Sequence, residues 1–203
     1  HSGESGILVG TQMLAKGHDF PGITLVAILD TDQALYSADF RASEHLAQLI
    51  TQVSGRAGRA QKTGEVLIQT HHPEHPLLQT LLHQGYESFA HNTLAEREHA
   101  ALPPHWHLII IRSESTAPHA ARDFLSDVVN LLRAQKNTTV DLFGPLPAPM
   151  ERRAGRYRYQ LMLQAKHRKP LHQLLLNSLG QIIKLKSAYK ARWSIDVDPY
   201  DTF

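Results

Sequence analysis

Apolar residues in the first part of the chain gather in short continuous runs that polar segments separate. The runs cover residues 7–10, 23–29 and 65–69. Continuous runs of this length are typical of strands that are buried on both faces of a parallel sheet. A helix is expected between the second and third runs, with Ser43 as its N-cap and Glu44 in its first turn. This alternation of strand and helix predicts a parallel sheet with right-handed crossovers.

Leucines recur at three- and four-residue spacing from residue 76 to about residue 101, which predicts a long helix. Leu102, Pro103 and Pro104 follow, and two consecutive prolines end a helix. The double proline is therefore the expected boundary between a first domain of residues 1–102 and a second domain of residues 103–203.

Beyond the double proline the order of the elements changes. The expected strands are 105–112, 140–143, 156–164 and 192–197, with a proline-rich loop through Pro149 and helices opened by Pro118 and Pro170. The order β-α-β-β-α-β is that of a split βαβ sandwich, in which two helices cover one side of an antiparallel sheet. Trp193, Ile195 and Val197 are expected on the buried face of the last strand. The whole chain is thus predicted to be α/β followed by α+β.

Composition narrows the class of protein. The chain has 203 residues, of which 42% are hydrophobic and 20% charged, so a packed globular protein is expected. The net charge is only +2, and a nucleic-acid footprint must therefore come from local clusters of basic residues. Cysteine is absent, which excludes disulfides and thiolate zinc sites here and fits a reducing compartment, so we expect a cytoplasmic protein. No apolar run approaches the ~18 residues that span a bilayer, and no signal peptide or membrane partner is expected.

The segment 52–59 carries two arginines close to two glycines. If the preceding helix continues through Arg59, then Gln52, Arg56 and Arg59 stand on one helix face, at positions i, i+4 and i+7. The planar guanidinium grips phosphate oxygens and keeps its charge, so the arrangement suits a polyphosphate. The alternative is the basic end of a helix followed by a glycine-rich stop.

A second polar segment follows the first apolar run. Thr11, Gln12, Lys16 and Asp19 supply a hydroxyl, an amide, an ammonium and a carboxylate within one expected strand-to-helix loop. Ligands of open α/β sheets lie beyond the carboxyl ends of strands, which makes this a natural place for chemistry. An ordinary polar loop is the alternative.

Two groups of residues have the composition of metal sites. Asp30 and Asp32 follow the second apolar run, and we expect them to cap a turn and bind neighbouring arginines rather than a metal. The histidine-rich segment 71–75 contains Pro73, which breaks any regular ligand face. A surface turn is therefore expected there, and no metal is expected in this chain.

The expected strand from residue 156 is strongly basic. Because side chains alternate along a strand, Arg156, Arg158 and Gln160 share one face, and tyrosines share the other. Arg152 and Arg153 extend the basic patch. The residues fit either a strand that arginine keeps soluble, or an anion site for single-stranded DNA or an acidic peptide.

Two of these segments resemble known helicase motifs. Residues 52–59 are similar to motif VI of superfamily 2 helicases, Gln-x-x-Gly-Arg-x-x-Arg, and residues 10–21 are similar to motif V. Together with the sequence of residues 39–44, they resemble one family in particular, the primosomal protein N′ or PriA replication-restart DNA helicases. The resemblance continues through residues 69–76, 144–149, 156–160 and 196–199, and it covers essentially the whole chain.

The resemblance implies the end of a second, RecA-like motor lobe followed by the terminal domain of an ATP- and Mg²⁺-dependent 3′-to-5′ helicase. It implies three sets of site residues in the motor lobe: the catalytic Arg59, Arg56 and Gln52, the nucleotide-side Gly17 and Asp19, and the DNA-binding Thr11, Gln12 and Lys16.

It also implies the partners of the intact helicase. These are forked and single-stranded DNA, other primosome proteins, and the acidic C-terminal tail of the single-stranded DNA-binding protein. Arg156, Gln160 and Arg158 are the residues expected to bind that tail. The family's zinc belongs to an upstream cysteine region that this chain does not contain.

The sequence contains no Gly-x-x-x-x-Gly-Lys-Ser/Thr phosphate loop and no acidic magnesium motif before residue 10, and nucleotide hydrolysis needs both. The chain alone is therefore expected to have no ATPase activity. Two other interpretations remain: a part of another superfamily 2 translocase, for branch migration or transcription-coupled repair, or a non-enzymatic nucleic-acid or peptide adaptor.

Overall fold

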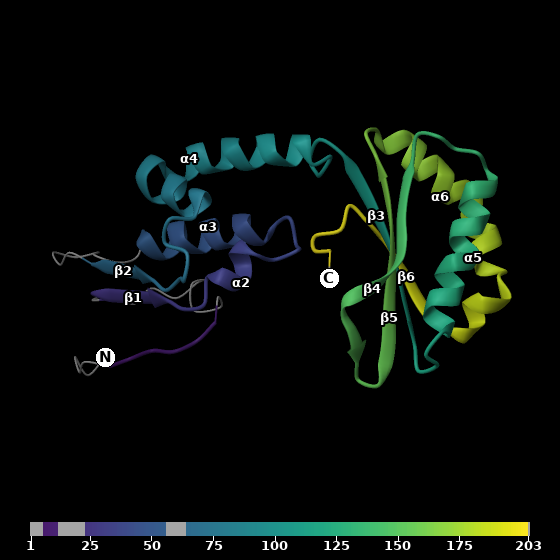
Figure 1. The fold of residues 1–203 in the computed structure, drawn as a ribbon, viewed down its shortest axis with the longest axis horizontal. Coiled ribbons are helices and arrows are strands. Elements are labelled where there is room, and N and C mark those ends of the chain that lie inside the picture. The colour runs from purple at the N-terminus through teal and green to yellow at the C-terminus, as the bar shows by residue number, and fades with distance from the viewer. Residues whose placement is uncertain (1–5, 12–22, 56–63, 203) are drawn as a thin grey trace. The chain divides into compact units, whose positions relative to one another are not determined.

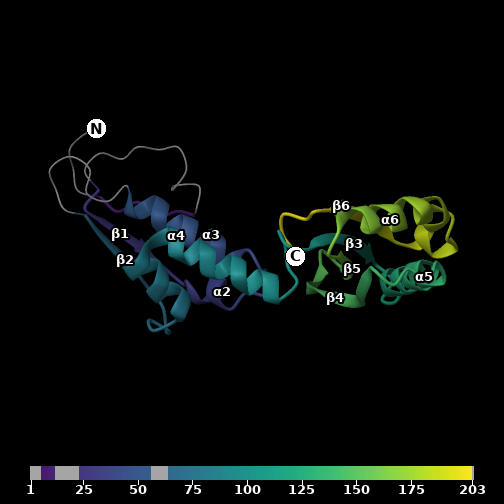
Figure 2. The ribbon, with the colours of Figure 1, turned by 90° about the horizontal axis from the view of Figure 1, so that it is seen from above.

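The structure is a computed structural model of the 203-residue chain, and it describes residues 6–11, 23–55 and 64–202. The chain divides into two compact units, with the division between Thr93 and Leu94 (Figures 1 and 2). Each unit is described below by itself. The domain boundary expected after residue 102 stays a prediction.

The first unit contains a two-stranded parallel sheet. Strands β1 (Leu25–Ile28) and β2 (Glu65–Ile68) pair in register from Leu25 opposite Glu65 to Ile28 opposite Ile68. The helices of this unit are α2 (Asp32–Leu35), α3 (Ala42–Ser54) and the first part of α4 (Pro76–His99). The predicted parallel pairing is therefore confirmed for the second and third apolar runs.

One face of this sheet supplies the core of the first unit. Side chains alternate along a strand, so Val26 and Ile28 of β1 lie on the same face, where they pack with the buried face of α3. The buried residues of the core are Ile28, Leu46, Ala47, Ile50, Val53, Leu78, Leu81 and Phe89. At the end of β1, the buried Thr31 hydroxyl donates to the Gln69 carbonyl at 2.8 Å and ties the two strand ends together.

Two predictions for the first unit are wrong. Residues 7–10 form no strand, and Ile7 is 95% exposed. An apolar strand is buried only where neighbouring strands cover it, and within the described residues β1 and β2 pair with each other alone. The N-cap of α3 is Arg41 rather than Ser43. The turn before it is closed by Asp39, whose carboxylate accepts the Arg41 N–H at 3.0 Å.

The long helix predicted from residue 76 is confirmed as α4, which ends at His99. Gly85 interrupts it with φ of 83° and ψ of 177°, so α4 is two helical pieces joined at a kink. A positive φ is readily adopted by glycine alone, which explains this residue at the kink.

The second unit is a four-stranded antiparallel sheet with two helices on one face (Figure 1). Its elements are β3 (His107–Ser115), α5 (Ala120–Ala134), β4 (Asp141–Arg153), β5 (Arg156–Ala165), α6 (Arg168–Ile183), the 3-10 helix η1 (Lys186–Lys190) and β6 (Arg192–Val197). The strands lie in the order β4-β5-β3-β6. The predicted β-α-β-β-α-β order is confirmed.

The core of the second unit lies between this sheet and the helices. Phe124 of α5 is fully buried and stacks on Trp193 of β6, with ring centroids 5.4 Å apart. The other fully buried large side chains of this core come from β3, β5 and both helices: Ile109, Ile111, Leu125, Val128, Leu132, Leu161, Leu163, Leu171 and Ile182.

Three details of the second unit differ from the sequence predictions. The expected proline-rich loop is part of β4, which absorbs its prolines through register shifts between Phe143 and Leu146 and between Pro147 and Arg152. Pro118 precedes α5, whose N-cap is His119. Val197 is 42% exposed rather than buried, because it lies in the last position of β6, at the end of the sheet.

Candidate binding site on the open face of the sheet

Polar and charged side chains gather on the side of the four-stranded sheet that faces away from α5 and α6, which we call the open face. Their position follows from alternation, since the residues between them in each strand point into the core. From β3 the open face carries Arg112 and Glu114. The others come from β5 and β6: Arg156, Arg158, Gln160, Arg192, Ser194 and Asp196.

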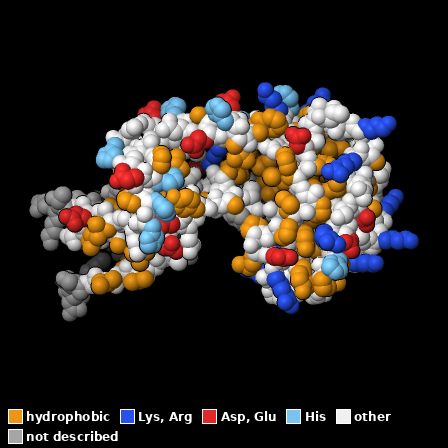
Figure 3. Space-filling model, viewed as in Figure 1, with side chains coloured by type: hydrophobic (Ala, Val, Ile, Leu, Met, Phe, Trp, Pro, Cys, Tyr) orange, Lys and Arg blue, Asp and Glu red, His pale blue; other side chains and the backbone are white. Residues whose placement is uncertain are grey.

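A cleft of about 240 Å³ lies on this sheet. It is lined by Arg112, Ser113, Glu114, Ala148, Arg158, Tyr159, Gln160, Arg192, Trp193 and Ser194, so all four strands contribute. Figure 3 shows how Lys and Arg side chains recur over the visible surface of the second unit, with acidic side chains between them. The cleft is thus a local cluster of guanidiniums within a chain that is nearly neutral overall.

The strand register sets the cleft residues in two rows across the sheet. In one row, Arg112 of β3 lies opposite Gln160 of β5 and opposite Ser194 of β6. In the other row, Glu114 of β3 lies between Arg158 of β5 and Arg192 of β6. The second row therefore places one carboxylate between two guanidiniums.

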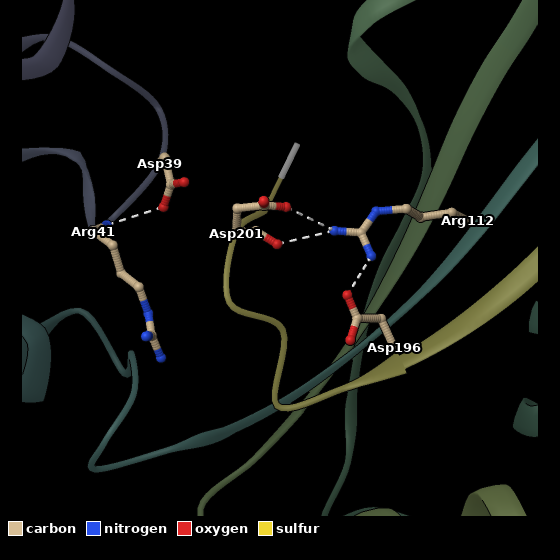
Figure 4. Close-up of polar contacts among 5 residues, drawn as sticks. All are labelled: Asp39, Arg41, Arg112, Asp196 and Asp201. Atoms are coloured by element: carbon tan, nitrogen blue, oxygen red, sulfur yellow. Dashed lines mark hydrogen bonds and ion pairs between the residues drawn. The ribbon is translucent and has the colours of Figure 1, made fainter. Parts of the chain in front are cut away.

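Arg112 is already engaged by acidic groups (Figure 4). Its Nη1 donates to Asp196 Oδ2 at 2.7 Å, and its Nη2 donates to the Asp201 carbonyl at 2.9 Å. Asp201 Oδ1 lies 3.5 Å from the same Nη2. The charge of Arg112 is thus balanced from within the unit, and this guanidinium holds the segment after β6 in place.

Arg156 and Arg158 differ in their surroundings, although they share one strand face. Arg156 Nε lies 3.7 Å from Glu114 Oε1, and Arg156 does not line the cleft. Arg158 lines the cleft, and its Nη1 makes a long contact of 3.5 Å with the Met150 carbonyl. Of the three polar residues predicted on this face, Arg158 and Gln160 therefore meet in the cleft.

The polar groups of the cleft are mainly hydrogen-bond donors. Its two aromatic residues, Tyr159 and Trp193, pack against the core on the helix side. Sequence-tolerant binding of single-stranded nucleic acid uses aromatic rings on which bases stack. Guanidinium and amide groups recognise carboxylates and phosphates instead. The chemistry of the cleft thus fits an acidic group better than a nucleobase.

Sequence reasoning missed Arg112 and Arg192. A signal for Arg112 was present, because Arg112 and Glu114 follow the apolar run 108–111 at a two-residue spacing that places them on one strand face. No comparable signal marks Arg192, the first residue of β6, since its place beside Glu114 follows from a pairing 78 residues apart along the chain.

The predicted motor-lobe residues lie mostly outside the described part of the chain. This holds for Gln12, Lys16, Gly17, Asp19, Arg56 and Arg59. Of the remaining two, Thr11 is exposed in an irregular segment, and Gln52 is exposed near the end of α3. The shared face proposed for Gln52, Arg56 and Arg59 is therefore untested by the structure.

The acidic and histidine-rich segments of the first unit meet at the end of β2. Asp32 accepts hydrogen bonds from the Thr70 hydroxyl at 2.5 Å and from the His71 N–H at 3.0 Å. These two hydrogen bonds hold the pKa of the Asp32 carboxyl below its ordinary value of 3.8, and the bond from Thr70 has the larger effect. Arginine was the expected partner of the acidic pair, but the partners seen for Asp32 are a hydroxyl and a backbone amide.

Residues 71–75 form an exposed turn, in which the His75 N–H donates to the His72 carbonyl at 3.0 Å. Tyr36 packs edge-on against the rings of His72 and His75. Within residues 6–11, 23–55 and 64–202, no three histidine or acidic side chains are grouped as a metal site would require. Over the same residues, no helix is both long and apolar enough to cross a bilayer.

Comparison with known families gives two separate matches. Residues 1–61 match the helicase conserved C-terminal domain, and residues 98–200 match the C-terminal domain of primosomal protein N. The second match alone covers just over half of the chain.

Individual relatives agree with these matches. The chain is 47% identical to the replication restart protein PriA of Haemophilus influenzae over 199 residues, which are 98% of this chain and 27% of the relative. Identity is 37% to the Bacillus subtilis protein of that name, over 98% of this chain and 25% of the relative. Identity to the Chlamydia pneumoniae protein of that name is 36%, over 100% of this chain and 27% of the relative. The chain spans about a quarter of the length of these relatives.

Among solved structures, a de novo designed protein covers 46% of this chain with a TM-score of 0.36 and 11% identity, a likeness too slight to bear on function.

Proposed function

The chain belongs to the PriA replication restart family, and from this premise we propose that it is the C-terminal part of an ATP-driven 3′-to-5′ DNA helicase that restarts stalled forks and initiates primosome assembly. The observation that carries the proposal is the pair of domains in sequence, a helicase C-terminal domain followed by the C-terminal domain of primosomal protein N. An adaptor without a motor has no use for the first of them.

The first part of the chain contributes to the motor of the intact protein. Arg59 and Arg56 act on the phosphates of ATP, together with Gln52. Gly17 and Asp19 lie near the nucleotide and its Mg²⁺. An arginine that reaches the γ-phosphate stabilises the charge that develops there during transfer, without further chemistry by the protein. Zinc belongs to the cysteine-containing region upstream of this chain.

The same part of the chain contacts DNA through Thr11, Gln12 and Lys16. A hydroxyl, an amide and an ammonium are groups that bind phosphate oxygens of a nucleic-acid backbone. We assign residues 1–102 to the end of a RecA-like lobe and residues 103–203 to the terminal domain. The parallel pairing of β1 with β2 supports the first assignment, and the β4-β5-β3-β6 sheet supports the second.

The open face of the terminal domain binds an acidic partner. Arg156, Arg158 and Gln160 are the residues that we assign to the acidic C-terminal tail of the single-stranded DNA-binding protein. A guanidinium binds a carboxylate through two parallel hydrogen bonds, and an amide pairs with a peptide backbone. The cleft supports a peptide ligand because Arg158 and Gln160 line it, and because Tyr159 and Trp193, which also line it, pack against the core. Forked DNA and other primosome proteins are the remaining partners.

Measuring ATP turnover tests the proposal. The intact protein should hydrolyse ATP rapidly when forked DNA is added, and the 203-residue chain should stay at background, because it lacks the phosphate loop. Turnover by the intact protein that forked DNA does not stimulate would indicate a different translocase. Turnover by the chain alone, lost on Arg59→Ala, would contradict the assignment to the end of a motor.

A further inference from the structure

Three guanidiniums line the cleft on the open face, but they are not equally available to a ligand. Arg112 is held by Asp196 at 2.7 Å and by the Asp201 carbonyl at 2.9 Å. Arg158 has, among the residues that the structure describes, a single polar contact, at 3.5 Å from the Met150 carbonyl. Arg192 is exposed and forms no ion pair with any residue that the structure describes. The free positive charge of the cleft is therefore that of Arg158 and Arg192.

These two arginines lie across the sheet rather than along a strand. Both are opposite Glu114 in the strand register, Arg158 from β5 and Arg192 from β6. Neighbouring strands are about 4.8 Å apart, so the two residues are separated by about 10 Å across β3. A peptide in the polyproline II conformation rises about 3.1 Å per residue and has three residues per turn. Two acidic side chains three positions apart therefore project on the same side, about 9 Å from each other.

We propose that Arg192 acts with Arg158 to bind two separate acidic side chains of a peptide that crosses the strands over Glu114. This inference rests on the proposed function of the open face and specifies the residues and the direction of its ligand. Arg156 stands outside the row of Arg158, Glu114 and Arg192, with its Nε 3.7 Å from Glu114 Oε1, so it is not one of the two arginines that this inference pairs with the spaced acidic side chains.

Glu114 favours a peptide ligand over a nucleic acid. It stands between Arg158 and Arg192 in the same row, and its carboxylate repels any ligand that carries negative charge along its whole length. A peptide with two spaced acidic residues avoids this repulsion, since uncharged backbone passes over Glu114. A backbone N–H of that peptide can donate to the carboxylate. Single-stranded DNA has no such neutral stretch, and the rings of Tyr159 and Trp193, on which bases would have to stack, pack against the core.

The test is a titration of the chain with labelled Gly-Asp-Ala-Ala-Asp-Gly at low salt. Arg192→Gln should weaken binding by about tenfold, because it removes one charged hydrogen-bonding pair. Arg133→Gln is the matched control: it removes an equal charge from the last turn of α5, on the helix side of the sheet, and should leave the affinity unchanged. A peptide with one aspartate replaced by asparagine should already bind weakly, and Arg192→Gln should weaken it much less than tenfold.

The outcomes separate this inference from the proposed function. If wild type and Arg192→Gln bind the peptide equally well, the role proposed for Arg192 is wrong, while the acidic-ligand function of the open face stands. Loss of binding in Arg156→Gln would then support that function. If wild type does not bind the acidic peptide at all, both are wrong. If an oligothymidine binds more tightly than the peptide and loses affinity on Arg192→Gln, the site is a nucleic-acid site and the peptide inference is overturned.

Discussion

Arg112 and Asp196 form an ion pair across two strands, with Arg112 Nη1 2.7 Å from Asp196 Oδ2. They are not direct partners in the ladder, because Arg112 lies opposite Ser194 and Asp196 lies opposite Ile110. The contact is therefore diagonal. The second nitrogen of the same guanidinium donates to the Asp201 carbonyl at 2.9 Å. One side chain from the middle of the sheet thus fixes both β6 and the segment that follows it.

Arg112→Ala should destabilise the second unit by about 1–2 kcal/mol, because it removes hydrogen bonds from a charged donor whose side chain is only 22% exposed. Urea unfolding measures the difference. Arg122→Ala is the control, since its contact with Asp123 is longer, at 3.6 Å, and both side chains are more than half exposed. It should change stability by less than about 0.5 kcal/mol. Equal effects of the two substitutions would show that the diagonal pair does not fix β6.

Phe124→Ala should cost about 3–5 kcal/mol, because it empties a fully buried site and removes a ring that stacks on Trp193. The fluorescence of Trp193 should also change in the folded state, as its stacking partner is lost. Leu176→Ala, at a residue that is 70% exposed on α6, should have an effect below about 0.5 kcal/mol. Thermal and urea unfolding of both variants check the contrast.

Asp32 should make the free energy of unfolding of the first unit depend on pH in the acidic range. Hydrogen bonds from Thr70 and from the His71 backbone lower the pKa of its carboxyl in the folded state below 3.8. A lowered folded-state pKa means that the stabilisation is present above that ordinary value and is lost as pH falls through the folded-state pKa.

Asp32→Asn should therefore be less stable than wild type at pH 7, and the difference should disappear in acid, once the pH is below the folded-state pKa of the Asp32 carboxyl. Unfolding curves across this pH range and the carboxyl chemical shift of Asp32 provide the measurement. A titration midpoint at or above 3.8 would contradict the role of Thr70.

In the intact protein, Arg59→Ala should reduce DNA-stimulated ATP turnover by roughly 10³-fold or more, as expected on removal of an arginine that stabilises the transferring phosphate. Binding to forked DNA should change little, because that contact is assigned to other residues. Steady-state turnover and DNA titrations give the two quantities. A loss below about tenfold would assign Arg59 to structure or to DNA contact instead.

Arg158→Glu should abolish binding of the acidic tail peptide of the single-stranded DNA-binding protein, because it replaces a donor with a repelling charge in the cleft. Gln160→Ala removes an uncharged partner and should weaken binding only severalfold. ATP turnover on naked DNA should survive in both variants. Fluorescence anisotropy with the labelled peptide measures the affinities, and Arg133→Glu on the helix side serves as the control. Unchanged affinity in Arg158→Glu would remove the open face from tail binding.

Most elements of the second unit could be predicted from local sequence. The strand predicted over residues 192–197 matches β6, and the strand predicted over residues 156–164 matches β5 within one residue. Both alternate between core and open-face residues, which is a local signal. β4 was predicted only in part, because its prolines have the composition of a loop. Proline cannot donate a hydrogen bond to a neighbouring strand, which an edge strand tolerates, and the register shifts of β4 accommodate its prolines.

The site was less predictable than the fold. Arg158 and Gln160 share the cleft because they are two residues apart on one strand, and spacing alone predicts that. Arg112 and Arg192 join them only through pairing between distant strands. Residues 7–10 are a second case in which local sequence is not enough. An apolar run forms a buried strand only if neighbouring strands cover it, and the run itself does not show whether they do.

The prolines of β4 have a consequence for self-association. β4 and β6 are the two edges of the four-stranded sheet, and an edge with free N–H and C=O groups is a template on which another chain can add. Pro145, Pro147 and Pro149 have no N–H to offer, so β4 is a poor template along the middle of its length. Growth of the sheet by strand addition, and with it edge-to-edge aggregation, is therefore directed to β6.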